Sequence, residues 1–146
     1  MRNTGMTGGR KQLSPQEVGE FLGSLYEQAA VGIEQVAPDG RLLMVNAAFC
    51  RMLGYSKSEL LGRTFDEIIP PDDRARNITL LKKMLAGEYK CYEIGRRYLH
   101  RNGSLVWAAV SSSIVRDKAG STLYCLCIVR DINERKLANS QFRLAV

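Results

Sequence analysis

Three β-rich segments follow one another in the last third of the chain, and this grouping constrains the fold more than any other feature. The segments cover residues 90–99, 105–115 and 122–130. Asn102-Gly103, a pair that favours a two-residue hairpin turn, separates the first two, and a longer turn at 117–120 separates the last two. Hairpins join antiparallel neighbours, so these segments predict one antiparallel sheet.

The first half of the chain predicts two more strands, over Gly32–Val36 and Leu42–Val45, joined by a turn at 38–40. Asn46 follows as the N-cap of a short helix that ends at Gly54. Strands that are grouped in this way, without regular alternation with helices, indicate an α+β fold with helices on one face of the sheet.

Further helices begin at residues that can cap them. The patterns at 56–59 and 64–67 are both capping boxes, and each predicts a short helical turn. Asp72 and Asp73 begin a longer helix that ends at Gly87. Near the N-terminus, the sequence 14–17 combines an N-cap serine, a proline and a capping-box glutamate. An apolar stripe at helical spacing then predicts an amphipathic helix over 14–29, with Val18, Phe21, Leu22, Leu25 and Ala29 on one face.

A series of short motifs follows along this predicted order of strands and helices. They are Gly32-Ile33, Asp39-Gly40, Val45–Phe49, Leu53–Ser56, Glu59–Gly62, Pro71–Asp73, then Asn102–Ser104, Trp107, Arg130–Ile132 and Glu134–Lys136. In order and spacing they resemble a bacterial PAS domain with its PAC half, over residues 20–136. The resemblance implies a five-stranded antiparallel sheet of order 2-1-5-4-3, with helices over one face that enclose a small pocket. It also implies a sensory module that passes a signal from a ligand, cofactor or partner through flanking helices to an output domain.

The expected organisation is a disordered basic leader (1–13), the N-terminal helix (14–29), the PAS core (30–131) and a C-terminal linker helix (132–146). Residues 141–146 resemble the start of another PAS domain, so we expect a fragment of a larger protein with a linked kinase, cyclase or further PAS domain. The net charge of +6 is concentrated at the ends, and residues 14–130 contribute only +2. We therefore expect no nucleic-acid partner.

Strand alternation brings the candidate pocket residues to one face of the sheet. The resemblance turns this face toward the pocket, to which the long helix adds two residues. The candidates are Tyr98, Ala108, Val110, Ser112, Cys125, Cys127, Val129, Ile78 and Leu81. They describe a small, mostly apolar pocket with a few hydroxyl and thiol groups, suited to a small apolar ligand. A close-packed core without a ligand fits the same pattern, and the chain would then be a dimerisation or scaffolding module.

Neither haem nor flavin is expected. His100 is the only histidine and lies beside a hairpin turn, where we expect it to be exposed, whereas haem-binding PAS domains carry their histidine on the long helix. Cys50 lies in the wrong helix for a flavin photoreceptor, and Ala108 and Val129 stand where that family has Asn and Gln. We interpret Cys50 as a small buried hydrophobic residue.

No metal or catalytic site is expected either. Cys125 and Cys127 lack the further ligands of a tetrahedral site, and the four cysteines are expected to be reduced. The sequence contains no nucleophile elbow, phosphate-binding glycine loop or zinc-protease motif, so we expect no enzyme activity.

The remaining predictions concern signal transmission. Arg130 and Asp131 are expected to couple the sheet to the C-terminal segment. The stripe Val18, Phe21, Leu22 and Leu25, together with Leu126 and Ile128 on the outer face of the sheet, predicts a homodimer interface. No run of 18 apolar residues exists, so we expect a cytoplasmic chain that does not insert into a membrane.

Overall fold

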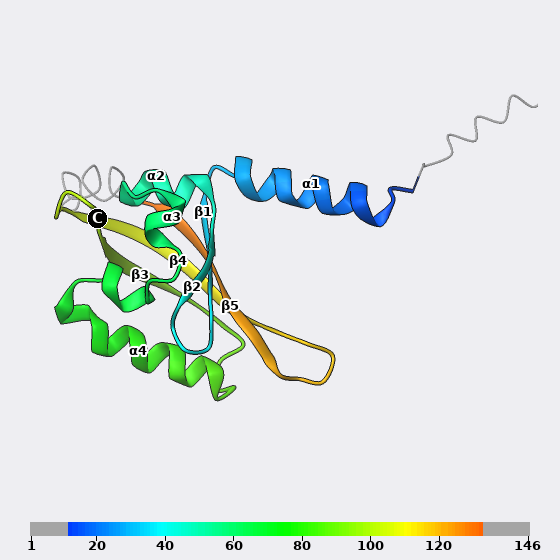
Figure 1. The fold of residues 1–146 in the computed structure, drawn as a ribbon. Coiled ribbons are helices and arrows are strands. Elements are labelled where there is room, and N and C mark those ends of the chain that lie inside the picture. The colour runs from blue at the N-terminus through cyan, green and yellow to red at the C-terminus, as the bar shows by residue number, and fades with distance from the viewer. Residues whose placement is uncertain (1–11, 133–146) are drawn as a thin grey trace, which may run out of the picture.

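Five strands form one antiparallel sheet in the order β2-β1-β5-β4-β3 (Figure 1). The computed structural model describes residues 12–132. The strands are β1 (Gly32–Val36), β2 (Leu42–Val45), β3 (Cys91–Leu99), β4 (Leu105–Arg116) and β5 (Thr122–Asp131). This is the strand order that the sequence resemblance implied. It leaves β2 and β3 as edge strands, with β5 at the centre.

Four helical elements, three short and one longer, cover one face of this sheet (Figure 1). They are α2 (Ala47–Leu53), α3 (Lys57–Leu60), the 3₁₀ helix η1 (Phe65–Ile68) and α4 (Pro71–Leu85). The hydrophobic core lies between the helices and the sheet. At its centre the rings of Phe49 and Tyr98 meet edge to face, with centroids 5.6 Å apart, an arrangement that aromatic pairs prefer.

Most of these helices begin as their sequences predict. Asn46 caps α2 through a bond from the Phe49 amide, and Ser56 forms a capping box with Glu59. The capping box predicted at Thr64 is wrong. The Thr64 hydroxyl donates to the Glu67 carboxylate instead of accepting a backbone N–H, and the segment forms a single 3₁₀ turn.

The N-terminal helix α1 (Pro15–Gln28) has the predicted capping box between Ser14 and Glu17. It extends away from the sheet (Figure 1), and none of its residues is buried. Its apolar stripe therefore lies exposed, with exposed fractions from 39% at Val18 to 57% at Phe21 and Leu22.

The predicted basic leader, apart from residues 12 and 13, and the predicted C-terminal linker helix, apart from Ile132, lie outside the described residues. Within residues 12–132, no helix is both long enough and apolar enough to cross a membrane.

Candidate ligand-binding site

One row of polar side chains crosses four strands on the face that the helices cover. Glu34 of β1 is paired with Cys127 of β5, Cys127 with Ser112 of β4, and Ser112 with Tyr92 of β3. Paired residues in a sheet point to the same face, so the register alone brings a carboxyl, a thiol and two hydroxyl groups into one line. This row forms the floor of the candidate site.

Arg96 of β3 places a buried positive charge beside the row. The residue is 4% exposed. Its guanidinium donates from Nε to Asn77 Oδ1 at 2.8 Å, from Nη1 to the Tyr98 hydroxyl at 3.2 Å, and from Nη2 to the Tyr92 hydroxyl at 3.3 Å. Asn77 lies on α4 and donates its own amide to the Asp73 carbonyl, which directs Oδ1 toward Arg96. The guanidinium thus links β3 to the helix above it.

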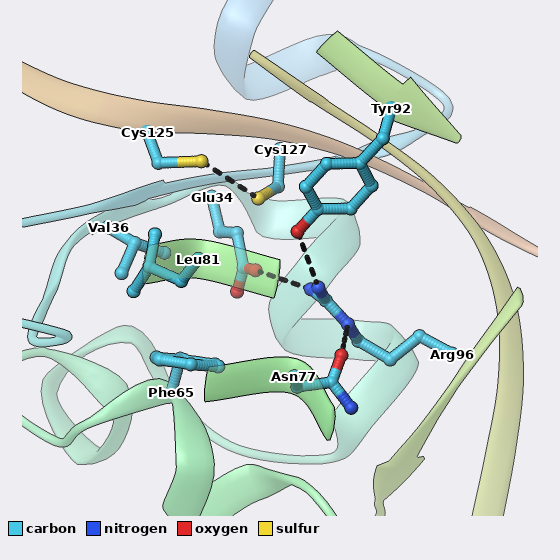
Figure 2. Close-up of a pocket in the computed structure, with 9 residues that line it drawn as sticks. All are labelled: Glu34, Val36, Phe65, Asn77, Leu81, Tyr92, Arg96, Cys125 and Cys127. Carbon is cyan, nitrogen blue, oxygen red and sulfur yellow. Dashed lines mark hydrogen bonds and ion pairs between the residues drawn. The ribbon is translucent and has the colours of Figure 1, made fainter. Parts of the chain in front are cut away.

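Glu34 supplies the opposing charge, but its hydrogen bonding is incomplete. The residue is 1% exposed, and Oε1 lies 3.7 Å from Arg96 Nη1 and 3.4 Å from the Tyr98 hydroxyl, which donates to it. Oε2 has no hydrogen-bond partner among the described residues. Figure 2 shows this oxygen on the side of the carboxyl group away from the dashed line to Arg96. Burial raises the pKa of Glu34 well above its ordinary value, and Arg96 opposes this only in part.

Two thiols complete the floor. The Cys127 sulfur lies 3.2 Å from Ser112 Oγ and 3.9 Å from the Cys125 sulfur. The hydrogen bond with Cys125 and burial raise the pKa of Cys127, and the same bond lowers that of Cys125. Both cysteines are free, as are Cys50 and Cys91. No group of three or more potential metal ligands occurs within the described part of the chain.

A small cavity lies above these side chains (Figure 2). Its volume is about 10 Å³, which is room for about one water molecule. The lining comes from the sheet, from η1 and from α4, and comprises Glu34, Val36, Phe65, Asn77, Leu81, Tyr92, Arg96, Cys125 and Cys127. The cavity therefore combines a buried charge pair with an apolar wall.

The residues predicted to line a pocket all contribute to the interior. Seven are buried (Tyr98, Ala108, Val110, Ser112, Cys125, Cys127 and Val129), and Ile78 and Leu81 pack partly buried against the core. Only Leu81, Cys125 and Cys127 line the cavity itself. The surface of the cavity is mostly apolar, as expected, but Glu34 and Arg96 add a buried charge pair that was not predicted.

The sequence analysis missed Glu34, Asn77, Tyr92 and Arg96. Strand alternation offers a signal for two of them, since Arg96 and Tyr92 lie two and six residues before Tyr98 and must share its face. Arg96 and Arg97 are neighbours in the sequence. Their surroundings differ: Arg97 is partly exposed and pairs with Asp73 on α4 at 2.7 Å, above the Trp107 ring.

The prediction that His100 is exposed is wrong. It is half-buried, because its ring packs against Gly54 at the end of α2. Its Nδ1 accepts a bond from the Asn102 amide and so serves the hairpin turn. Cys50 lies on α2 and is only partly buried.

The residues predicted to transmit the signal lie on the outer face and at one end of the sheet. Arg130 and Asp131 are exposed at the end of β5. Ile128 is 43% exposed and Leu126 is half-buried, both on the face away from the helices.

The fold, the strand order and the enclosed cavity define a class of sensory domain, and comparison with known proteins agrees. A family model described as PAS domain matches residues 29–134. The chain belongs to the PAS domain family.

Several relatives are signalling proteins. The probable diguanylate cyclase DgcE of Escherichia coli (strain K12) is 38% identical over 127 residues, covering 87% of this chain and 11% of the relative. The sensor histidine kinase TmoS of Ectopseudomonas mendocina is 31% identical over 115 residues, covering 79% of this chain and 12% of the relative. The chain thus spans only a small part of both relatives.

A solved structure supports the same assignment. The PAS domain of an HTR-like protein from Haloarcula marismortui superposes with a TM-score of 0.69 at 29% identity, covering 80% of this chain and 93% of that one. The chain is a PAS sensory domain, and its relatives carry such domains within kinases and cyclases.

Proposed function

We propose that this domain receives its signal at the Glu34–Arg96 cavity and passes it to a covalently linked kinase, cyclase or further PAS domain. The observation that carries the proposal is the buried Glu34 carboxyl, which has one oxygen beside a cavity and without a hydrogen-bond partner in the described part of the chain. A buried polar atom without a partner costs free energy, so a filled core would favour an apolar residue here. This supports a sensory site over the alternative of a dimerisation or scaffolding module with a filled core.

A chain of contacts supports a route from the cavity to α1. Glu34 follows Ile33, whose amide donates to Asn46 Oδ1 at 2.9 Å. The Asn46 amide group in turn donates to the Tyr26 carbonyl in the last turn of α1, at 2.9 Å. A second link is the ion pair between Lys57 of α3 and Glu27 of α1, at 2.5 Å. A shift of β1 would therefore reach α1 through Asn46, and a shift of α3 would reach it through Lys57.

A chimera tests the proposal. This chain would replace the matching segment of the E. coli diguanylate cyclase relative, and cyclase activity would be measured. Leu81→Phe places a larger side chain at the cavity wall. Leu123→Phe makes the same change at an exposed position of β5 that lines neither the cavity nor the groove beside it. We expect Leu81→Phe to change cyclase activity severalfold and Leu123→Phe to leave it within twofold. Equal activities in two folded variants would contradict the proposal.

We also propose that the domain acts as a homodimer, with the α1 stripe and the outer face of the sheet as its interface. The stripe is exposed within the described chain, and the outer face carries a groove lined in part by Val31, Ile128 and Ile132. Exposed apolar surface of this kind is typical of interaction sites.

Sedimentation at tens of micromolar protein tests the dimer. Phe21→Glu places a charge within the stripe and should shift the protein to monomer. Ser24→Glu adds the same charge at another exposed position of α1 and should leave the dimer intact. A monomeric wild-type chain would overturn this part of the proposal.

A further inference from the structure

We propose that the ligand of the cavity is a small neutral molecule that binds through a hydroxyl group to Glu34 Oε2. This inference rests on the proposed function, because it names the chemical class that the same site accepts. It follows from three properties of the site: the unpartnered oxygen, the charge balance and the shape of the apolar wall.

The unpartnered atom defines the binding group. Oε2 of Glu34 is buried and has no partner in residues 12–132, whereas Oε1 already faces Arg96 and Tyr98. An ionised carboxylate at this position needs a donor, and a protonated one needs an acceptor. A hydroxyl group satisfies either state, because it both donates and accepts. An ammonium serves only the ionised carboxylate, and a ligand carboxylate serves only the protonated one.

The charge balance of the site favours a neutral ligand. The Arg96 guanidinium and the Glu34 carboxyl lie 3.7 Å apart, and the other polar groups around them are the hydroxyls of Tyr92 and Tyr98, the Asn77 amide and the Cys127 thiol. When Glu34 is ionised, the pair is balanced and a third charge would have no counter-ion, which is strongly unfavourable in buried space. When Glu34 is protonated, an ammonium would only add to the positive charge of Arg96. A neutral hydroxyl compound adds a hydrogen bond without adding a charge.

The apolar wall limits the size of the ligand. Val36, Phe65 and Leu81 face the carboxyl group across the cavity (Figure 2). Phe65 and Leu81 also line a groove of about 280 Å³ on their other side, between α4 and the turn at 38–40. These two side chains line both spaces, and the cavity alone has room for about one water molecule. The proposed ligand therefore requires a rotation of Leu81 that joins the cavity to the groove. The joined space would suit a molecule with a few carbon atoms whose apolar part lies against this wall.

Four probes of similar shape test the inference. Propan-2-ol, acetone, isopropylammonium and acetate differ in charge and in their ability to donate, and each would be titrated into the 146-residue chain with labelled methyl groups at pH 7.5. We expect saturable shifts of the Leu81 and Val36 methyl signals with propan-2-ol, with a Kd on the order of 1 mM. The other three probes should bind at least tenfold more weakly.

A double variant tests whether the charge pair causes the preference for propan-2-ol over acetone. Glu34→Leu/Arg96→Met removes both charges together, a replacement that buried ion pairs often tolerate without loss of stability. It should bind propan-2-ol and acetone with affinities within twofold of each other. The control Glu93→Gln, at an exposed position of β3, should keep the wild-type preference.

Three results would overturn the inference. They are the absence of saturable binding of propan-2-ol, tighter binding of acetate or isopropylammonium, and an unchanged preference in the double variant. None of them depends on signal transmission. The cyclase chimera with Leu81→Phe would still report on the proposed function, so the two failures are distinguishable.

Discussion

The side-chain amide of Asn46 donates a hydrogen bond to the main-chain carbonyl of Tyr26, 2.9 Å away, and thereby joins the last turn of α1 to the first turn of α2. The same side chain donates to the Val31 carbonyl and accepts from the Ile33 and Phe49 amides. A single fully buried residue therefore holds α1, β1 and α2 in one arrangement.

Replacing Asn46 should destabilise the domain and release α1. Asn46→Ala leaves buried backbone donors and acceptors without partners, and we expect a loss of about 3 kcal/mol in the free energy of unfolding. Urea unfolding followed by circular dichroism measures this loss. Asn46→Asp retains the acceptor for Ile33 and Phe49 but loses the donor to Tyr26. It should raise the amide hydrogen-exchange rates in the last turn of α1 more than those in α2. Equal increases in the two helices would contradict this role of Asn46.

The stability of the domain should fall as pH rises, because of Glu34. Burial raises the pKa of this carboxyl well above its ordinary value. Above the unfolded pKa of about 4.3, the folded protein retains a proton that the unfolded chain has lost. Stability is therefore complete below this pH and decreases toward the raised pKa, by up to about 1.4 kcal/mol per pH unit.

Urea unfolding at pH 5 and pH 8 tests this dependence. Glu34→Gln removes the titrating group, so the variant should lack the part of the decrease that Glu34 causes. Glu93→Gln, which alters an exposed carboxyl on β3, should retain it. Identical pH profiles for wild type and Glu34→Gln would show that the carboxyl group does not change its pKa on folding.

The two neighbouring arginines of β3 should differ sharply in their importance. Arg97→Gln removes an ion pair with Asp73 whose side chains are 26% and 25% exposed, and such pairs contribute about 0.5–1 kcal/mol. Arg96→Gln leaves Glu34 buried without its opposing charge, which costs about 3–5 kcal/mol. Urea unfolding of both variants compares them. A larger loss in Arg97→Gln would contradict the assigned roles.

Gly54 should tolerate no side chain, for two separable reasons. Its φ of +79° is unfavourable for an L-residue, and an added Cβ would lie 2.5 Å from Cε1 of His100. Gly87 has a similar φ of +82° with open space around it, so Gly87→Ala reports the backbone cost alone, about 1 kcal/mol. We expect Gly54→Ala to cost at least twice as much in thermal or urea unfolding. The loss of stability that Gly54→Ala causes beyond that of Gly87→Ala should be smaller when His100 is also replaced by Ala. An undiminished loss in the His100→Ala background would exclude the steric contact with His100 as its cause.

Much of this fold could be predicted from local sequence signals. The capping residues Ser14, Asn46 and Ser56 act over a few neighbouring residues, and each forms the expected structure. Thr64 is the exception among the caps, because its hydroxyl finds a side-chain partner in Glu67 instead of a backbone one. A hairpin forms at Asn102-Gly103, but the predicted two-residue turn is wrong: the His100 amide donates to the Ser104 carbonyl, so residues 101–103 form the loop, and of these only Gly103 has a positive φ.

The charged part of the site was harder to predict, because it depends on contacts between distant segments. Glu34 and Arg96 are 62 positions apart in the sequence, and only the register across four strands brings them together. Charged residues within strands are usually exposed, and the pairing that makes their burial tolerable is not visible locally. His100 was misjudged for the same reason, since its neighbour Gly54 belongs to another element.

The attachment of α4 to β3 has a further consequence. Two consecutive residues of the edge strand bind two consecutive turns of the helix, Arg97 at Asp73 and Arg96 at Asn77. Counter-ions reach the first contact, which is partly exposed, but not the second, which is buried. Ionic strength therefore acts on one end of this helix and leaves the other unaffected, so that added salt would loosen the N-terminal turn of α4 while the turn above the cavity stays bound.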